Sequence, residues 1–204
     1  MKKLLQGIKD FRQHKLDEYR EKFSKLAHGQ APDTLFVACC DSRVVPNTFA
    51  STDPGDLFVL RNIGNLIPPY GATDGTSVAA AIEFSTLVLH ISYIVICGHS
   101  DCGAMRAFTE NTVHTQGPAI EKWLSYAEPS YEKLLKVHPL PADPHNLLSH
   151  INVIQQLEHL KTYPEVKRRL ESGELKIHGW WFDLATADVY EYDEKTQEFV
   201  IIGV

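Results

Sequence analysis

The sequence predicts an α/β fold: a mostly parallel central β-sheet flanked by helices, with an N-terminal helical arm and a C-terminal hairpin at the sheet edge. Short runs of apolar and β-branched residues alternate with longer stretches of helical spacing, which is the pattern of strand–helix–strand units. The early runs are apolar throughout, as in parallel strands that are covered on both faces. Residues that can bind a metal or move a proton follow directly after two of these runs.

Length and composition describe one ordinary globular domain. A chain of 204 residues can build a single core, so residues 1–204 are expected to form one domain. The net charge of −6 leaves no basic excess to neutralise phosphates, which argues against a nucleic-acid-binding protein. Polar residues interrupt the apolar start of the chain, and no run of 18 apolar residues occurs. We therefore expect a cytoplasmic protein without an export signal or a membrane segment.

The N-terminal arm, residues 1–28, is expected to be an amphipathic helix over residues 2–27. Its apolar residues recur at helical spacing between charged ones, and Gly29 is a plausible stop. Two interpretations are open at this point. The helix covers the core of its own chain, or it is an arm that packs on a second subunit.

The remaining elements follow in chain order. Strands are expected over residues 34–38, 57–60, 93–97 and 175–182, with a closing hairpin over 189–192 and 199–202. Helical spacing predicts helices over 75–90, just after 103, and over 118–137, 145–160 and 164–171. The sequence contains neither internal repeats nor low-complexity segments.

Three residues at strand ends are candidate metal ligands. Cys39 ends the first strand, and His99 and Cys102 follow the third. The carboxyl ends of parallel strands meet at one edge of a sheet, so these side chains converge if the two strands are neighbours. Two thiolates and one imidazole are typical of catalytic zinc, which commonly keeps an open fourth position. The absence of CxxC pairs makes a structural four-ligand site the weaker alternative, and Cys40 and Cys97 are interpreted as small core residues.

Asp41 and Arg43 come two and four residues after Cys39 and share its side of an extended backbone. A carboxylate beside a guanidinium forms a charge-assisted pair that stays ionised. The alternative is a surface ion pair of little energetic value. A phosphatase loop is excluded, because no arginine stands six residues after Cys39 or Cys40.

These motifs resemble the β-class carbonic anhydrases. The pattern C-x-D-x-R at 39–43, followed by H-x-x-C at 99–102, is specific to that family, and the segment 54–62 also resembles it. The similarity runs from about residue 30 to residue 179. The resemblance implies a Zn²⁺ ion held by Cys39, His99 and Cys102, with Asp41 and Arg43 as the catalytic dyad. It also implies reversible hydration of carbon dioxide to bicarbonate and a proton by zinc-bound hydroxide.

Further implications of the resemblance concern substrate and assembly. The substrate-pocket residues of the plant-type branch correspond here to Gln30, Phe58, Ile63 and Gly103. The resemblance implies that Gln30 donates a hydrogen bond to substrate, partly across a dimer interface. Phe84 stands where that branch usually has a tyrosine. The basic unit is expected to be a homodimer built with the N-terminal arm, often assembled into a tetramer or larger.

Two features of the resemblance leave alternatives open. Some bacterial members have an inhibitory bicarbonate site, whose tryptophan, arginine and tyrosine match Phe36, Arg61 and Phe182 here, so we expect that site to be absent. Some members have an inactive state in which the aspartate, here Asp41, ligates zinc.

The alternative functions are a carbon disulfide or carbonyl sulfide hydrolase on the same scaffold, and a non-catalytic zinc-stabilised binding module.

Overall fold

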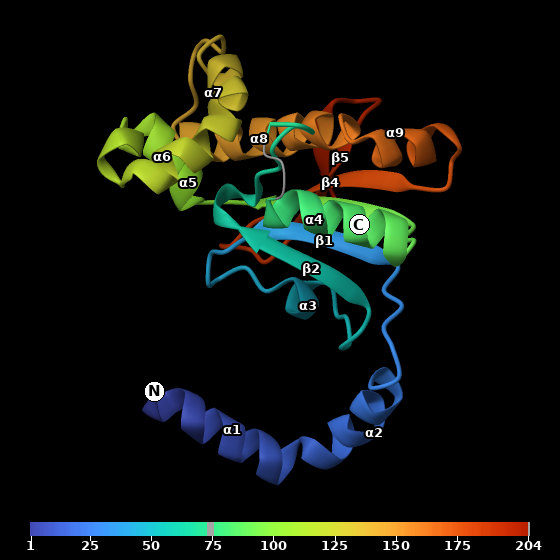
Figure 1. Cartoon of the computed structure of the whole chain (residues 1–204). Coiled ribbons are helices and arrows are strands. Elements are labelled where there is room, and N and C mark those ends of the chain that lie inside the picture. Colours follow the sequence, from blue (N-terminus) through green and yellow to red (C-terminus); the bar gives the residue numbers. More distant parts are fainter. Residues whose placement is uncertain (73–75, 204) are drawn as a thin grey trace.

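The computed structural model describes residues 1–72 and 76–203 and confirms the predicted α/β fold (Figure 1). Its six-stranded sheet has the order β2-β1-β3-β4-β5-β6. The first four strands in the chain are parallel: β1 (Thr34–Cys39), β2 (Leu57–Asn62), β3 (Tyr93–His99) and β4 (Lys176–Phe182). The antiparallel strands β5 (Val189–Asp193) and β6 (Glu198–Ile201) form the predicted hairpin at one edge.

The register of the parallel strands places the predicted ligands at one edge of the sheet. Cys39 pairs with Asn62 of β2, and Ala38 beside it pairs with Cys97 of β3. His99 ends β3 opposite Phe182, the last residue of β4. The four strands end within one residue of the same level, so the loops that follow them meet there.

Alternating residues of the strands point to the two faces of the sheet, and apolar side chains are buried on both. One face, which includes Leu35, Val37, Ile94 and Ile96, is fully buried, and burying each such side chain contributes about 1.5–3 kcal/mol. The long helix α8 (Pro144–Lys161) covers this face and approaches it closely. A Cβ atom at Gly98 would lie 2.7 Å from Val153 Cγ2 of α8, so this contact requires glycine.

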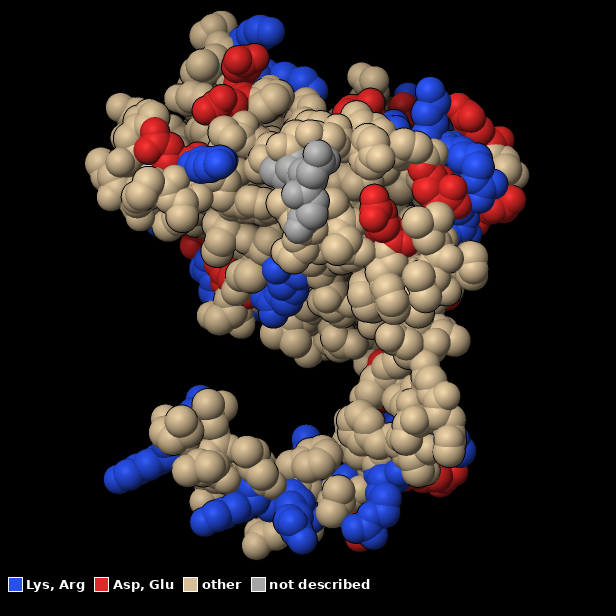
Figure 2. Space-filling view, in the orientation of Figure 1, with Lys and Arg blue, Asp and Glu red and all other residues tan. Residues whose placement is uncertain are grey.

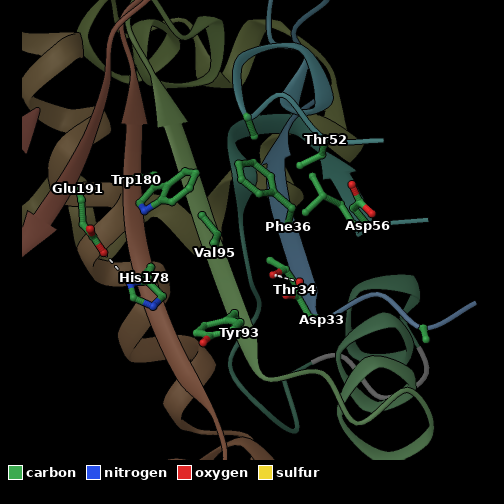
Figure 3. Close-up of a pocket in the computed structure, with 13 residues that line it drawn as sticks. Asp33, Thr34, Phe36, Thr52, Asp56, Tyr93, Val95, His178, Trp180 and Glu191 are labelled. Carbon is green, nitrogen blue, oxygen red and sulfur yellow. Dashed lines mark hydrogen bonds and ion pairs between the residues drawn. The ribbon is translucent and has the colours of Figure 1, made fainter. Parts of the chain in front are cut away.

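The opposite face carries an aromatic cluster and remains partly open. Phe36 packs edge-on against Trp180, and Phe49 of the short helix α3 (Pro46–Phe49) stacks on Phe182 with ring centroids 4.5 Å apart. Next to this cluster lies a cavity of about 600 Å³, lined by residues in or beside β1, β3, β4 and β5 and by residues of the segment 50–57 (Figure 3).

Several predicted helices are interrupted. The helix expected over 118–137 is divided into α6 (Pro118–Leu124), a 3₁₀ turn (Ser125–Ala127) and α7 (Glu128–Leu134). Pro129 lies in the first turn of α7, where backbone N–H groups have no partner within the helix, so its missing N–H costs nothing. In the middle of a continuous helix the same proline would remove a hydrogen bond. The predicted helices after 103, over 145–160 and over 164–171 are confirmed as α5 (Gly103–Thr109), α8 and α9 (Pro164–Glu171).

The helix expected over 75–90 is α4 (Ser77–Glu83) followed by a π-helical turn (Phe84–Val88), while its predicted start at Gly75 lies outside the described residues. Two hydroxyls, those of Ser85 and Thr86, both donate to the carbonyl oxygen of Ile82. The buried Arg169 of α9 donates to the carbonyl oxygen of Thr86 at 3.0 Å. These side-chain bonds satisfy carbonyls that a regular α-helix would pair with backbone N–H groups.

The N-terminal arm extends away from the body of the molecule (Figure 1). It is two helices, α1 (Lys2–His14) and α2 (Leu16–Leu26), rather than the single predicted one. The bend at Lys15 brings the rings of Phe11 and Tyr19 to 5.7 Å, although eight residues of straight helix would separate them by about 12 Å along the axis. Neither helix has a buried residue, so within one chain the arm covers no core.

Among the described helices, none combines the length and apolar character needed to cross a bilayer.

Candidate metal centre

Three predicted ligands form a compact buried cluster. Cys39, His99 and Cys102 each offer one ligand atom, and these atoms all lie within 4.8 Å of one another. Cys39 and His99 are the last residues of β1 and β3, and Cys102 is the residue directly before α5. Their exposed fractions are 5%, 0% and 1%. The parallel register therefore brings together groups that are distant in the sequence.

The imidazole of His99 is oriented to bind a cation. Its Nδ1 lies 2.8 Å from the carbonyl oxygen of Ser100, which can only accept, so Nδ1 carries the proton. Nε2 then carries a free lone pair, and it is buried without a hydrogen-bond partner. A buried acceptor left without a partner is costly unless a ligand completes it. This is the arrangement usual for metal-binding histidines.

The two sulfur atoms also favour a cation between them. A hydrogen bond from Cys102 lowers the pKa of Cys39 to about 4, and the Gly64 N–H adds to this effect. The pKa of Cys102 is raised in turn by Cys39 and by burial. Without a positive charge only one sulfur of the pair ionises readily. Two sulfurs and one nitrogen match the donor set of zinc, so these residues fit a Zn²⁺ ion.

The Asp41–Arg43 pair lies just beyond the cluster. Arg43 Nε and Nη2 donate to the two oxygens of Asp41 at 2.9 and 2.7 Å, and the Arg43 backbone N–H donates to Oδ1 at 3.0 Å. These hydrogen bonds hold the pKa of Asp41 well below its usual range. Asp41 is therefore a carboxylate at neutral pH, oriented by a bidentate contact.

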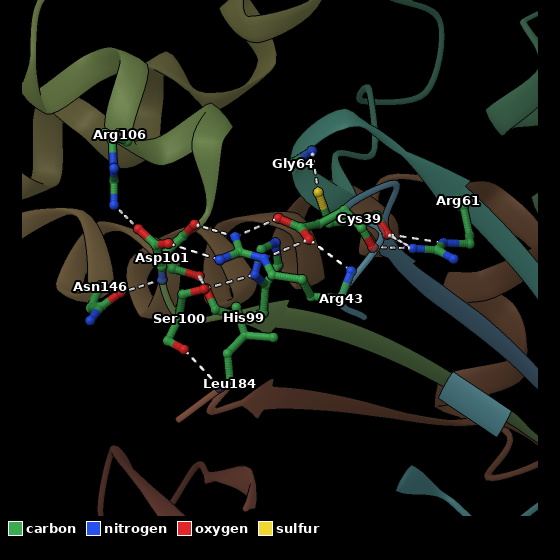
Figure 4. A network of polar contacts seen from close by, with 12 residues as sticks. Cys39, Arg43, Arg61, Gly64, His99, Ser100, Asp101, Arg106, Asn146 and Leu184 are labelled. Carbon is green, nitrogen blue, oxygen red and sulfur yellow. Dashed lines mark hydrogen bonds and ion pairs between the residues drawn. The ribbon is translucent and has the colours of Figure 1, made fainter. Parts of the chain in front are cut away.

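A network of charges continues from this pair across the mouth of the site (Figure 4). Arg43 Nη1 donates to Asp101 Oδ2 at 2.9 Å, and Nη2 donates to the Asp101 carbonyl oxygen at 3.1 Å. Arg106 of α5 forms an ion pair with the other carboxylate oxygen of Asp101. Arg43 thus connects the loop after β1 with the loop after β3.

Comparison with known proteins agrees with this geometry. The sequence profile of a family described as carbonic anhydrase matches residues 34–189. A carbonic anhydrase of Pseudomonas aeruginosa is 40% identical over 205 residues, covering 100% of this chain and 92% of its own length. The solved structure of the β-carbonic anhydrase CcaA matches with a TM-score of 0.94 and 38% identity, over 100% of this chain and 92% of that one.

The chain belongs to the β-carbonic anhydrase family. It is accordingly an enzyme, a carbonic anhydrase. One of two solved tetrameric β-carbonic anhydrases of Sordaria macrospora also matches, with a TM-score of 0.80 and 27% identity, over 92% of this chain and 94% of that one.

Other residues support the β-carbonic anhydrase site but were missed in the sequence. Arg61 at the end of β2 donates to the carbonyl oxygens of Cys39 and Asp41, at distances of 2.7–3.0 Å. It thereby fixes the loop that carries both side chains. The resemblance assigns Arg61 only to an inhibitory site, whose other two positions are here Phe36 and Phe182 of the buried aromatic cluster.

One side of helix α8 supports the ligand loops through polar side chains. Asn146 accepts from the N–H of Asp101, and Ser149 donates to the carbonyl oxygen of His99. Asn152 donates to the carbonyl oxygen of Gly64, whose N–H donates to Cys39 Sγ at 3.4 Å. Gly64 has a φ of 76°, a conformation that favours glycine. The sequence signal for this role is the three-residue spacing of Asn146, Ser149 and Asn152 on one predicted helix.

The four predicted pocket residues are separated in a single chain. Gly103 follows Cys102 directly, and Ile63 follows β2 with 45% of its surface exposed. Phe58 of β2 pairs with Leu35 of β1, which precedes Cys39 by four residues. Phe58 therefore lies about 13 Å along the strand direction from the level of Cys39. Gln30 precedes β1 and lies exposed beyond the amino ends of the strands. Within one chain, neither Phe58 nor Gln30 is placed at the ligand edge.

The other two cysteines differ from each other. Cys97 is fully buried, and burial raises the pKa of its thiol far above the usual value, as expected of a core residue. The interpretation of Cys40 as a core residue is wrong, because its side chain is exposed. Cys40 lies one residue beyond β1, where the alternation of the extended chain turns it away from the cluster.

Proposed function

We propose that this chain catalyses the zinc-dependent, reversible hydration of carbon dioxide to bicarbonate and a proton. One observation carries the proposal. A buried cluster of two sulfurs and one unpartnered imidazole nitrogen lies beside a carboxylate, Asp41, that Arg43 keeps ionised. Cys39, His99 and Cys102 would hold the ion. A zinc ion so bound acidifies a water molecule toward a pKa of about 7 and so supplies a nucleophile at neutral pH.

The residues of the chain orient the reaction. Asp41 has no proton to donate, so it can only accept a hydrogen bond from the attacking water, and this acceptor is held in one direction by Arg43. Such fixed orientation lowers the entropy that the reaction must lose. Ile63 and Val45 are exposed apolar side chains on the two loops next to the cluster, and they offer a surface that suits an apolar gas. Gly103 follows Cys102 directly, and a Cβ atom built there would meet no atom within 4 Å, so the space beside it is open.

The alternative functions have no comparable support. In the described part of the chain, the cluster contains three candidate ligands and no fourth, whereas a purely structural zinc module would use four. The relatives are described as carbonic anhydrases, and nothing favours hydrolysis of carbon disulfide or carbonyl sulfide.

A stopped-flow assay of carbon dioxide hydration, with and without a zinc chelator, tests the proposal. We expect fast hydration by the protein as purified, with one zinc ion per chain by elemental analysis. Stripping the metal should abolish hydration, and adding Zn²⁺ should restore it while Mg²⁺ does not, because a hard cation prefers oxygen ligands. Full activity in the demonstrably metal-free protein would refute the proposed function.

We further propose that the enzyme works as a homodimer or a larger assembly in the reducing cytoplasm. The arm, residues 1–28, carries eight Lys and Arg against four Asp and Glu, a net charge of +4, whereas residues 29–204 carry −10. Figure 2 shows basic side chains gathered along the arm. Leu4, Leu5 and Ile8 of α1 are 52–69% exposed, although burial of such residues is favourable.

The open face of the sheet is a suitable place for the arm of a second copy. Its cavity is lined by acidic Asp33, Asp56 and Glu191, of which Glu191 contacts His178 (Figure 3). An amphipathic basic helix would complement both the charge and the apolar floor formed by Phe36 and Trp180. Such an assembly would also allow Gln30 and Phe58 of one chain to contribute to the site of the partner chain.

Replacing Leu4 and Ile8 together with aspartate should therefore dissociate the assembly. Two charges would have to be desolvated at an apolar contact, which is strongly unfavourable. Sedimentation velocity at micromolar concentration should show the wild type as a dimer or larger and the variant as a monomer. Gln13→Asp, on the same helix but at an exposed polar position, is the matched control and should leave the assembly intact. A monomeric wild type would contradict the proposal.

A further inference from the structure

Asp101 lies between two of the ligands and faces the catalytic pair. Its carboxylate accepts from Arg43 Nη1 at 2.9 Å, and its carbonyl oxygen accepts from Arg43 Nη2 at 3.1 Å. The other side of the same guanidinium holds Asp41. We propose that Asp101 is a positioning residue of the hydration reaction, which acts by fixing Arg43 and, through it, Asp41. This inference rests on the proposed function.

The need for such a residue follows from the exposure of Arg43. Its side chain is 47% exposed, so packing alone does not hold it. An arginine bound only to Asp41 could move together with that carboxylate as one ion pair, since both belong to the same loop. Asp101 belongs to the loop after β3, so its two contacts prevent this joint movement. Bidentate contacts on both sides use most of the guanidinium N–H groups.

Asp101 is itself held in place from two further elements. Its backbone N–H donates to Asn146 Oδ1 of α8 at 2.8 Å, and its carboxylate forms an ion pair with Arg106 of α5. Its φ of 55° lies in the left-handed region, which aspartate and asparagine tolerate better than other non-glycine residues. The side chain is therefore a fixed reference point for Arg43. Asp101→Asn removes the charge while keeping this backbone preference.

A merely structural role for Asp101 makes a different prediction. If Asp101 only stabilised the loop of His99 and Cys102, its loss would weaken metal binding regardless of Arg43. If it acts through Arg43, its loss should have no effect once Arg43 is already replaced. A double-mutant cycle separates these cases, because it measures the coupling between two groups rather than the sum of their effects.

The experiment compares the wild type, Asp101→Asn, Arg43→Gln and the double variant as full-length zinc proteins. We expect Asp101→Asn to lower kcat/KM for carbon dioxide hydration roughly tenfold, a size usual for coupled charged neighbours. In the Arg43→Gln background the same change should have less than about a twofold effect. Zinc should remain at one per chain in all four proteins. With Co²⁺ in place of zinc, Asp101→Asn and Arg43→Gln should alter the visible spectrum in the same way.

Three results would overturn the inference. They are an unchanged kcat/KM in Asp101→Asn, an equal loss in the Arg43→Gln background, or loss of zinc from Asp101→Asn. Asp183→Asn is the matched control: its carboxylate accepts from Ser100 of the same loop at 3.3 Å without reaching Arg43, so hydration should be unchanged. Failure of the proposed function would show itself separately, as a wild type without zinc-dependent hydration.

Discussion

Replacing Cys102 with alanine should remove the metal and the activity together. Cys102 supplies one of three clustered donor atoms. Its side chain is 1% exposed, so water does not readily reach this position to replace the lost sulfur ligand. Its loss leaves one sulfur and one nitrogen, too few to hold zinc. Even loss of an outer partner of a ligand weakens metal binding about 10–100-fold, so we expect at least about a hundredfold here. Elemental analysis after gel filtration, with stopped-flow hydration, measures both effects.

The matched control is Cys97→Ala, which removes another buried cysteine, this one within β3, the strand that precedes Cys102. Cys97 is fully buried on the opposite face of the sheet and is absent from the ligand cluster. We expect this variant to keep one zinc ion and near-normal hydration, with a modest loss of thermal stability from the small cavity. A fully zinc-loaded Cys102→Ala protein would refute the assignment of Cys102 as a ligand.

The ligand cluster could be predicted from sequence because it depends on few features of the fold. Parallel strands bring their carboxyl ends to one edge whatever covers their faces, so Cys39 and His99 needed only neighbouring strands to meet. The strand order β2-β1-β3 provides this neighbourhood. Asp41 and Arg43 were equally accessible, because their pairing is local and follows from extended-chain alternation.

Breaks in helices were less predictable because the apolar spacing continues through them. The bend at Lys15 and the π-helical turn at Phe84–Val88 keep the spacing of a helix, yet ring contacts and side-chain hydrogen bonds alter the local geometry. The hydrogen bonds of Ser85 and Thr86 are local, but the bond from Arg169 to the Thr86 carbonyl is tertiary, and tertiary contacts override weak local propensities. A single sequence records the pattern but not which partner will compete with the helix.

The charge network around the site illustrates the same limit. Asp101 stands between two predicted ligands, but nothing in its spacing shows that Arg43, 58 residues earlier, reaches it. The support that Asn152 gives to Gly64 likewise joins residues 88 positions apart. Sequence patterns identify chemistry at strand ends, whereas side-chain bonds between loops require coordinates.

Replacing Asp41 with asparagine should leave zinc bound and remove most of the turnover. Asparagine has nearly the same size, but its amide offers one acceptor oxygen instead of two. If this oxygen stays with Arg43, the NH₂ group faces the site and presents a donor where an acceptor is needed. A positioned proton acceptor typically contributes 10²–10⁴-fold to rate, so kcat/KM should fall by about that factor. Stopped-flow hydration at matched zinc content measures it.

The size of this loss relative to that of Asp101→Asn is itself informative. Asp41 lies next to the cluster and accepts directly from Arg43, whereas Asp101 reaches the reaction only through that arginine. The effect of Asp41→Asn should therefore exceed that of Asp101→Asn at least tenfold, and zinc content should be equal in both. If the kcat/KM of Asp41→Asn stayed within tenfold of the wild-type value, the carboxylate would serve only as a structural ion-pair partner of Arg43. A group that orients the attacking water cannot be replaced by a hydrogen-bond donor with so small a loss of kcat/KM.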